Sequence, residues 1–143
     1  MSYRYLDDTA IADAAFEASG RTPEEVFRAA ADALMNLMVE NMDSIERKKN
    51  RKIAVDDFDM DMLLFKFLDE LIFHKDAHEL LLRVESIIIA KRDGRFLATA
   101  DARGEKIDPG KHRLNVDVKA VTLHDFALTQ TGDIWTAHVH LDI

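Results

Sequence analysis

Residues 134–143 form the most regular stretch of the sequence, because apolar and polar side chains alternate along it to the last position. Side chains of an extended chain point alternately to opposite faces, so this pattern predicts a β-strand with one buried and one polar face. Such a strand would hold the carboxylate of Asp142 next to the α-carboxylate of Ile143. Two carboxylates held rigidly so close together are costly, and we therefore expect a cation or a basic group to neutralise them.

Two segments carry the apolar spacing of amphipathic helices. The first begins after Thr22, a good N-cap that is followed by Pro23 at the first helical position and by Glu25, which completes a capping box. We expect this helix to end near Asn41. The second helix begins in a run of four aspartates. We interpret one of them as the N-cap and the other three as negative charges that stabilise the positive end of the helix dipole. A metal-binding loop is the less favoured alternative, because the EF-hand spacing and its glycine are absent. These aspartates are Asp56, Asp57, Asp59 and Asp61.

The remaining ordered segments are predicted strands. Short strands are expected at 11–18 and 53–55, with hairpin turns at Asp93-Gly94 and at 131–133 further along the chain. Two helices packed on a mostly antiparallel sheet define an α+β fold, and the lack of a linker or repeat predicts a single domain over residues 1–143. The strands expected after residue 79 are 80–90, 95–103, 114–124, 126–130 and 134–143.

Acidic residues outnumber basic residues in this chain by 27 to 19, which gives a net charge of −8. A protein whose main function is to bind the phosphate backbone of a nucleic acid should be basic, so we expect no nucleic-acid-binding residues. The one basic cluster, residues 47–52, is interpreted as a solvated loop between a helix and a strand. Lys119 is a lone cation in an apolar strand, and it is either a surface lysine or one that reaches toward a carboxylate cluster.

The sequence contains no cysteine, which excludes disulfides, thiolate zinc sites and thiol nucleophiles and fits a cytoplasmic protein. No apolar run is long enough to span a membrane, and the first residues lack the core of a signal peptide. We therefore expect no membrane partner.

Two histidine pairs could ligate a metal. His74 and His78 fall where the second helix should end, so we favour interaction with the helix dipole over zinc binding. His138 and His140 share one strand face with Asp142, and this face is either an ordinary solvated surface or a set of three ligands. The second alternative predicts a stand-alone metal-dependent hydrolase.

Four segments, in this order and spacing, resemble the archease family across essentially the full chain. Residues 12–20 with 22–27 are similar to the family's opening strand, glycine and capped helix. Residues 63–71 match its second helix, residues 118–124 its Lys-Ala-x-Thr-Tyr-His segment, and 141–143 its closing residues. The chain departs from the family pattern where Ala10 and Ile11 replace a His-Thr pair and where Leu123 replaces tyrosine.

The resemblance implies a small α+β protein that activates an RtcB-type RNA ligase, an enzyme that uses GTP and Mn²⁺ in tRNA splicing. Archease promotes ligase guanylylation and turnover, is not itself an enzyme, and meets RNA only through the ligase. By this resemblance Asp13, Asp142 and Ile143 hold a divalent cation and Lys119 lies near it, with no catalytic residues. Oxygen ligands make Ca²⁺ the first expectation, with Mg²⁺ and Mn²⁺ as alternatives. A purely structural metal-binding module is the remaining possibility.

Overall fold

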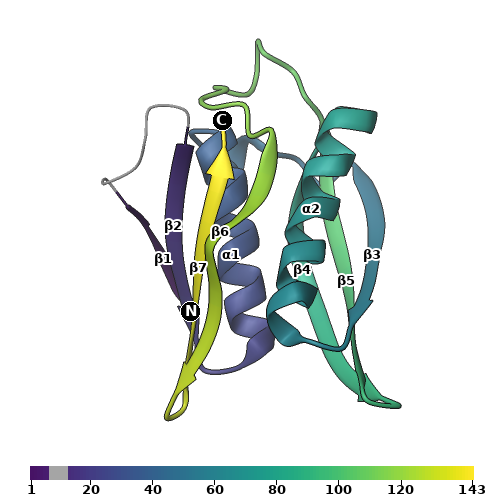
Figure 1. Cartoon of the computed structure of the whole chain (residues 1–143). Coiled ribbons are helices and arrows are strands. Elements are labelled where there is room, and N and C mark those ends of the chain that lie inside the picture. The colour runs from purple at the N-terminus through teal and green to yellow at the C-terminus, as the bar shows by residue number, and fades with distance from the viewer. Residues whose placement is uncertain (7–12) are drawn as a thin grey trace.

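The computed structural model describes residues 1–6 and 13–143, and Figure 1 shows their arrangement. Strands open and close the described chain, and the two helices are separated by a single strand. The departures from the family pattern at Ala10 and Ile11 lie outside the described residues. In chain order the elements are β1 (Ser2–Leu6), β2 (Asp13–Gly20), α1 (Pro23–Met38), the 3₁₀ turn η1 (Met42–Ser44), β3 (Lys49–Asp57), α2 (Met60–His78), β4 (Leu80–Arg92), β5 (Arg95–Lys106), β6 (Ala120–Thr131) and β7 (Ile134–Asp142).

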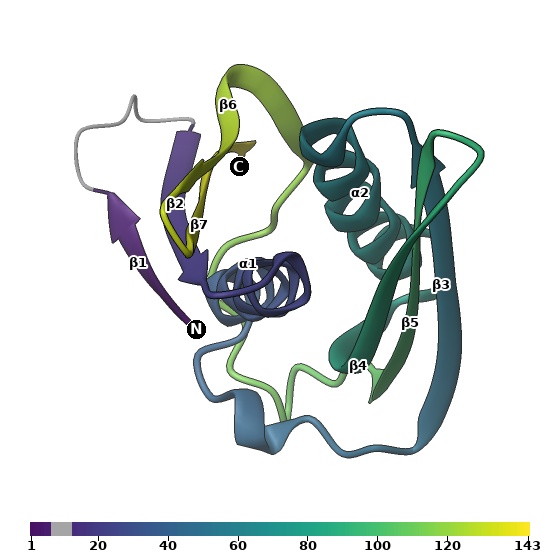
Figure 2. The same cartoon turned by 90° about the horizontal axis from the view of Figure 1, so that it is seen from below.

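The strands form two antiparallel sheets, and both helices lie between them (Figure 2). One sheet has the order β1-β2-β7-β6 and the other β3-β5-β4. Apolar side chains from α1, α2 and the inner faces of both sheets form one hydrophobic core. The α+β class, the antiparallel pairing and the two helices are as the sequence predicts. The expectation of one sheet is too simple, because a layer of helices with apolar residues on both sides needs a sheet on each side.

Helix α1 begins as its sequence predicts. Thr22 Oγ1 accepts a hydrogen bond from the Glu25 backbone N–H at 3.1 Å, and Pro23 occupies the first turn. The second half of the expected capping box is replaced, because the Glu25 carboxylate lies 3.5 Å from the amino group of Met1. The helix ends at Met38, close to the expected Asn41.

The strand predicted at 114–124 is wrong in its first half. The backbone N–H of Asn115 bonds to the carbonyl of Met38, and that of Val116 bonds to the carbonyl of Leu37. These carbonyls belong to the last turn of α1, where a helix leaves acceptors unsatisfied. The segment therefore completes a helix end instead of joining a sheet. Regular pairing starts at Ala120, and β6 then continues through a bulge as one strand to Thr131.

The basic cluster at 47–52 is also placed differently. Residues 49–52 form the first half of β3 rather than a loop, and β3 is an edge strand paired only with β5. The cluster is mostly solvent-exposed, as expected for charged residues. Lysine and arginine on an edge strand also discourage pairing with another chain.

The aspartate run divides between a strand and a helix. Asp57, in β3, accepts a hydrogen bond from the Asp59 N–H at 3.0 Å and pairs with Lys66 at 2.9 Å, and these contacts lower the pKa of its carboxyl. Asp59 occupies the N-cap position of α2, but its side chain makes no capping hydrogen bond, so the expected cap by an aspartate side chain is not formed there. Asp56 also lies in β3 and pairs with Arg95 at 2.7 Å, whereas Asp61 does lie in the first helical turn.

Strand β1 is a strand that the sequence pattern did not reveal. It pairs with β2, and its tyrosines reach α1: Tyr5 donates its hydroxyl hydrogen to the carbonyl of Ala33 at 2.7 Å, and Tyr3 donates to the side chain of Asn36 at 3.2 Å. Within residues 1–6 and 13–143, no helix combines the length and the hydrophobicity needed to cross a membrane.

Candidate functional site

Asp13 and Asp142 are direct cross-strand partners, although almost the whole chain separates them. Asp13 is the first residue of β2, Asp142 is the last of β7, and the antiparallel register places them opposite each other. Residues opposite each other in an antiparallel pair point to the same face, with Cβ atoms about 4.5–5.5 Å apart. The structure therefore brings together the two aspartates that the family resemblance selected. Figure 1 shows β2 and β7 side by side, with Ile143 directly after β7.

Lys119 approaches Asp142 from the other side of β7. Its backbone N–H donates a hydrogen bond of 2.8 Å to the carbonyl oxygen of Asp142, and the next residue, Ala120, pairs with Asp142 in the sheet. The side chain of Lys119 is exposed, and its ammonium group makes no ion pair with any residue that the structure describes. The lysine is thus beside the aspartates through its backbone, with its charge still available.

The donor set at this end of β7 consists of oxygen atoms. Two carboxylates and the backbone at Ile143 suit a hard divalent cation, which takes six to eight oxygen ligands in the case of Ca²⁺. Within the described part of the chain, no three or more His, Cys, Asp or Glu side chains are grouped so that they could hold a metal ion. A cation between Asp13 and Asp142 would therefore complete its coordination with backbone oxygens or water.

Lys75 is a buried cation that the sequence analysis missed. It lies on α2 and is only 6% exposed, and its ammonium group bonds to the Val118 carbonyl at 2.8 Å and to Asp117 and Asp76, both at 2.6 Å. Burial alone would lower the pKa of Lys75, but the two carboxylates outweigh burial and raise it. The sequence could have indicated this burial, because Lys75 follows Leu71 by one helical turn and therefore lies on the same apolar face of α2.

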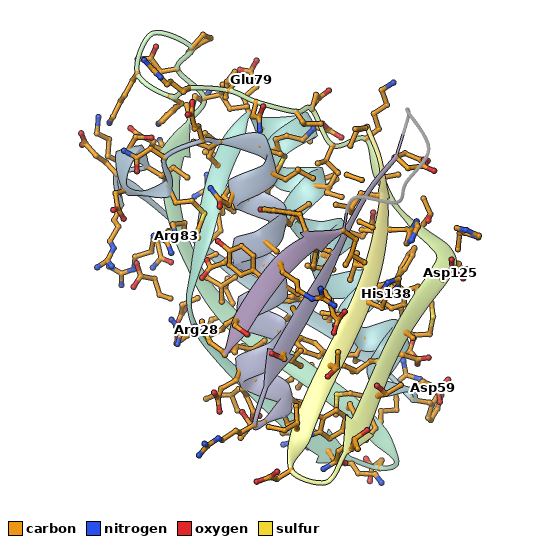
Figure 3. All side chains as sticks on the ribbon, turned by 90° about the vertical axis from the view of Figure 1, so that its left-hand side faces the viewer. Arg28, Asp59, Glu79, Arg83, Asp125 and His138 are labelled. Atoms are coloured by element: carbon orange, nitrogen blue, oxygen red, sulfur yellow. The ribbon has the colours of Figure 1, made fainter. Side chains whose placement is uncertain are left out.

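The histidine face of β7 has contacts of its own. Nδ1 of His138 lies 2.9 Å from the Asp125 carbonyl oxygen, which only accepts, so Nδ1 carries the hydrogen (Figure 3). Asp125 lies in the bulge of β6 with φ 51°. The ring of His140 packs against His138 and His124 at centroid distances of 5.5 and 5.1 Å. In the described residues these rings and Asp142 do not make the three-ligand set that a stand-alone hydrolase would need.

The other histidine pair lies where the sequence predicts, in the last turns of α2. The ring centroids of His74 and His78 are 5.7 Å apart, and Phe73 packs edge-on against both rings. Burial lowers the pKa of His74. No third ligand side chain joins the pair in the portion of the chain that the structure describes.

Comparison with known proteins gives the family. Residues 3–143 match the model of the Archease protein family (MTH1598/TM1083). The chain belongs to the archease family. Protein archease of Pyrococcus furiosus is 37% identical over 133 residues, covering 92% of this chain and 93% of that protein. Protein archease of Methanosarcina barkeri is 36% identical over 142 residues, covering 99% and 95%.

A solved archease-family structure has the same fold. The solution structure of Methanobacterium thermoautotrophicum protein 1598 superimposes with a TM-score of 0.85 at 32% identity, and the match covers 99% of this chain and 98% of that one. The resemblance inferred from four short segments is therefore confirmed across residues 3–143 in sequence, and the fold agrees as well.

Proposed function

We propose that this archease-family protein is a non-catalytic activator of an RtcB-type, GTP-dependent RNA ligase. It would act in the cytoplasm in tRNA splicing and RNA repair, promoting guanylylation of the ligase and its repeated turnover. The family assignment supports this function, and the observation that carries it is the pairing of Asp13 with Asp142 next to Lys119. These residues come from three strands or strand ends and gather at one end of one sheet.

The proposed role of the two aspartates is to hold a divalent cation, with Ca²⁺ first and Mg²⁺ or Mn²⁺ as alternatives. Their placement opposite each other on β2 and β7 supports this role, because two carboxylates on one face of a sheet supply adjacent oxygen ligands for a cation. The oxygen of Ile143 would be a further ligand. The bound ion would join the start of β2 to the end of β7 and fix the shape of the surface presented to the ligase.

Contact with the ligase, rather than with RNA, fits the charge of the protein. A net charge of −8 repels phosphate backbones and attracts a basic RNA-processing enzyme. The exposed ammonium of Lys119 would stand out from this acidic surface. It would be available for a phosphate or carboxylate at the nucleotide site of the ligase.

The test is a time course of ligase guanylylation with GTP and Mn²⁺, with and without the protein. Wild type should accelerate guanylylation, whereas Asp142→Asn and Lys119→Met should each lose most of the acceleration. Asp133→Asn is a matched control, because Asp133 is an exposed aspartate in the turn at the opposite end of β7. The absence of acceleration by wild type with the cognate ligase would refute the proposal.

A second measurement separates activation from a purely structural metal site. Thermal unfolding of the wild type should shift upward when Ca²⁺ is added, since a ligand that binds only the native state stabilises it by about 2.7 kcal/mol at one hundred times its dissociation constant. Asp142→Asn should lose this shift. If Asp142→Asn loses the shift but still activates the ligase fully, the cation is structural and the proposed role of the pair is wrong.

A further inference from the structure

A cavity of about 250 Å³ lies between α1, η1 and strands β4 and β5, and its charged lining consists of four arginines with Asp43 and Glu85. Arg28 comes from α1, Arg47 from the segment before β3, Arg83 from β4 and Arg103 from β5. Figure 3 shows Arg28 and Arg83 on the side of the molecule away from His138 and Asp125. Four arginines against two carboxylates leave the lining with an excess of positive charge, in contrast to the net charge of −8 of the whole chain, and we call this cavity the arginine pocket.

Two of the four arginines are neutralised by carboxylates. Arg47 pairs with Glu85 at 2.6 Å, and Arg83 lies 3.4 Å from Asp32 and 3.9 Å from Asp43. The distances around Arg83 are long for a charge-assisted hydrogen bond, which is usually about 2.7–2.9 Å. The guanidinium of Arg83 is therefore only loosely held and can turn toward an anion.

The other two arginines have no such partner. Arg28 and Arg103 form no ion pair with any residue in the described ranges 1–6 and 13–143. The Nε atom of Arg28 is shielded from solvent, and no acceptor for its hydrogen is present among those residues. A buried charged donor without an acceptor is costly, so a pocket of this kind favours a ligand that brings acceptor oxygens.

The size and chemistry of the pocket define the ligand class. Guanidinium groups match phosphate oxygens with two parallel hydrogen bonds, and several arginines facing one cavity suit an anion with many oxygens. Pockets for drug-sized molecules measure about 300–1,000 Å³. The arginine pocket is smaller than this range, so it suits one or two phosphate groups rather than a whole nucleotide.

We propose that the arginine pocket binds a phosphate or pyrophosphate group, either as a free anion or as the phosphate end of a nucleotide whose base remains outside. Arg28 and Arg103 supply the unpaired donors, and Arg83 turns from Asp32 to join them. The pocket is separate from the pair Asp13 and Asp142, and the proposal does not depend on the ligase.

The test is isothermal titration of the full chain with inorganic phosphate, with pyrophosphate and with a nucleoside diphosphate. The buffer contains no divalent cation, so that pyrophosphate cannot act by chelation, and sodium chloride keeps the ionic strength constant. Saturable binding of pyrophosphate is expected. Tighter binding of the nucleoside diphosphate would identify a nucleotide tail as the ligand, and equal or weaker binding would identify the free anion.

Three variants locate the site. Arg28→Gln and Arg103→Gln should each weaken binding by about tenfold or more, as expected for the loss of a hydrogen bond to a charged group. Arg103 is exposed, so its variant should fold even if Arg28→Gln does not. Arg113→Gln removes the same charge from an exposed arginine outside the pocket that lies 3.8 Å from Glu40, and it should bind like wild type.

Two results would overturn the proposal. One is the absence of saturable binding by wild type at anion concentrations up to about 10 mM, beyond which affinity is too weak for a built site. The other is an equal loss of affinity in Arg103→Gln and Arg113→Gln, which would show general electrostatic attraction instead of a pocket.

Discussion

Lys75 Nζ donates a hydrogen bond of 2.8 Å to the carbonyl oxygen of Val118, and this bond joins the end of α2 to the segment that leads into β6. Val118 is fully buried, and the next residue is Lys119, whose backbone bonds to Asp142. The position of Lys119 beside the paired aspartates therefore depends on a lysine from another part of the fold. Asp117 and Asp76 complete the surroundings of the Lys75 ammonium.

Replacing Lys75 by methionine should destabilise the protein by about 1–3 kcal/mol, because the Val118 carbonyl would be left without its buried donor. Urea unfolding followed by circular dichroism measures the change. Ligase activation should fall more than stability explains, since the backbone at Lys119 loses its anchor. Lys66→Met is the matched control: Lys66 lies on the same helix and pairs with Asp57, but it is 45% exposed, so its loss should cost less than about 1 kcal/mol. Equal costs for the two variants would contradict this account.

Glu105 should make the protein sensitive to acid. Burial alone would raise the pKa of its carboxyl, but hydrogen bonds from the Glu46 backbone N–H, Lys111 and His112 outweigh burial and lower the pKa from 4.5 to about 2. Because folding favours the ionised form, its contribution to stability is complete above pH 4.5 and is lost as the pH falls from 4.5 to about 2.

Glu105→Gln removes this charge with little change of shape. At pH 7 the variant should be less stable by about 2–4 kcal/mol, because the buried network loses its acceptor charge. Denaturant unfolding at several pH values should also show a shallower loss of stability below pH 4.5 than in wild type. Glu17→Gln, which breaks an exposed pair with Arg4, should change stability by less than about 1 kcal/mol. An unchanged acid profile in Glu105→Gln would exclude Glu105 as the cause.

Gly104 is required by close contact between strands. A Cβ at this position would overlap the carbonyl oxygen of Leu81, which belongs to the neighbouring strand β4 and cannot move aside cheaply. Gly104→Ala should therefore destabilise the protein by more than about 3 kcal/mol in thermal or urea unfolding. Gly110→Ala adds the same methyl group in a loop, where the nearest neighbouring atom, Asp108 Oδ1, is 3.4 Å away, and it should be tolerated. A mild effect of Gly104→Ala would mean that β4 and β5 can separate locally.

Glu79 ends α2 in the left-handed region, with φ 55° and ψ 36°. Residues other than glycine adopt this conformation at a cost, so Glu79→Gly should stabilise the protein by about 0.5–1 kcal/mol. The same exchange inside the helix, Glu70→Gly, should destabilise it by about 1 kcal/mol. Differential scanning calorimetry of both variants checks that their changes in stability have opposite signs. Destabilisation by Glu79→Gly would show that the Glu79 side chain contributes more to stability than its backbone conformation costs.

Local chemistry made part of the fold predictable. The start of α1 followed from Thr22 and Pro23, because capping is decided within one turn of the chain. The turn at Asp93-Gly94 followed in the same way, and both residues have the positive φ angles, 53° and 79°, that a two-residue hairpin requires. These features need no knowledge of distant residues.

The features that could not be predicted from the sequence depend on residues that are distant along the chain. Residues 114–119 alternate like a strand, but their backbone is used to satisfy the last carbonyls of α1, which the local pattern does not contain. Lys75 looked like an ordinary helical lysine because its burial depends on Asp117 and Val118. The opposition of Asp13 and Asp142 is likewise a matter of strand register, and the sequence suggested it only through family resemblance.

The order of strands in the first sheet has a consequence for synthesis. β7 lies between β2 and β6, so the described strand that leaves the ribosome last occupies an inner position of its sheet. Until it emerges, β1 and β2 form only a two-stranded hairpin, which is marginally stable in water. Asp13 therefore meets Asp142 only after β7 has been synthesised. A cation site that needs both residues would thus form late in folding, after β7 has inserted between β2 and β6.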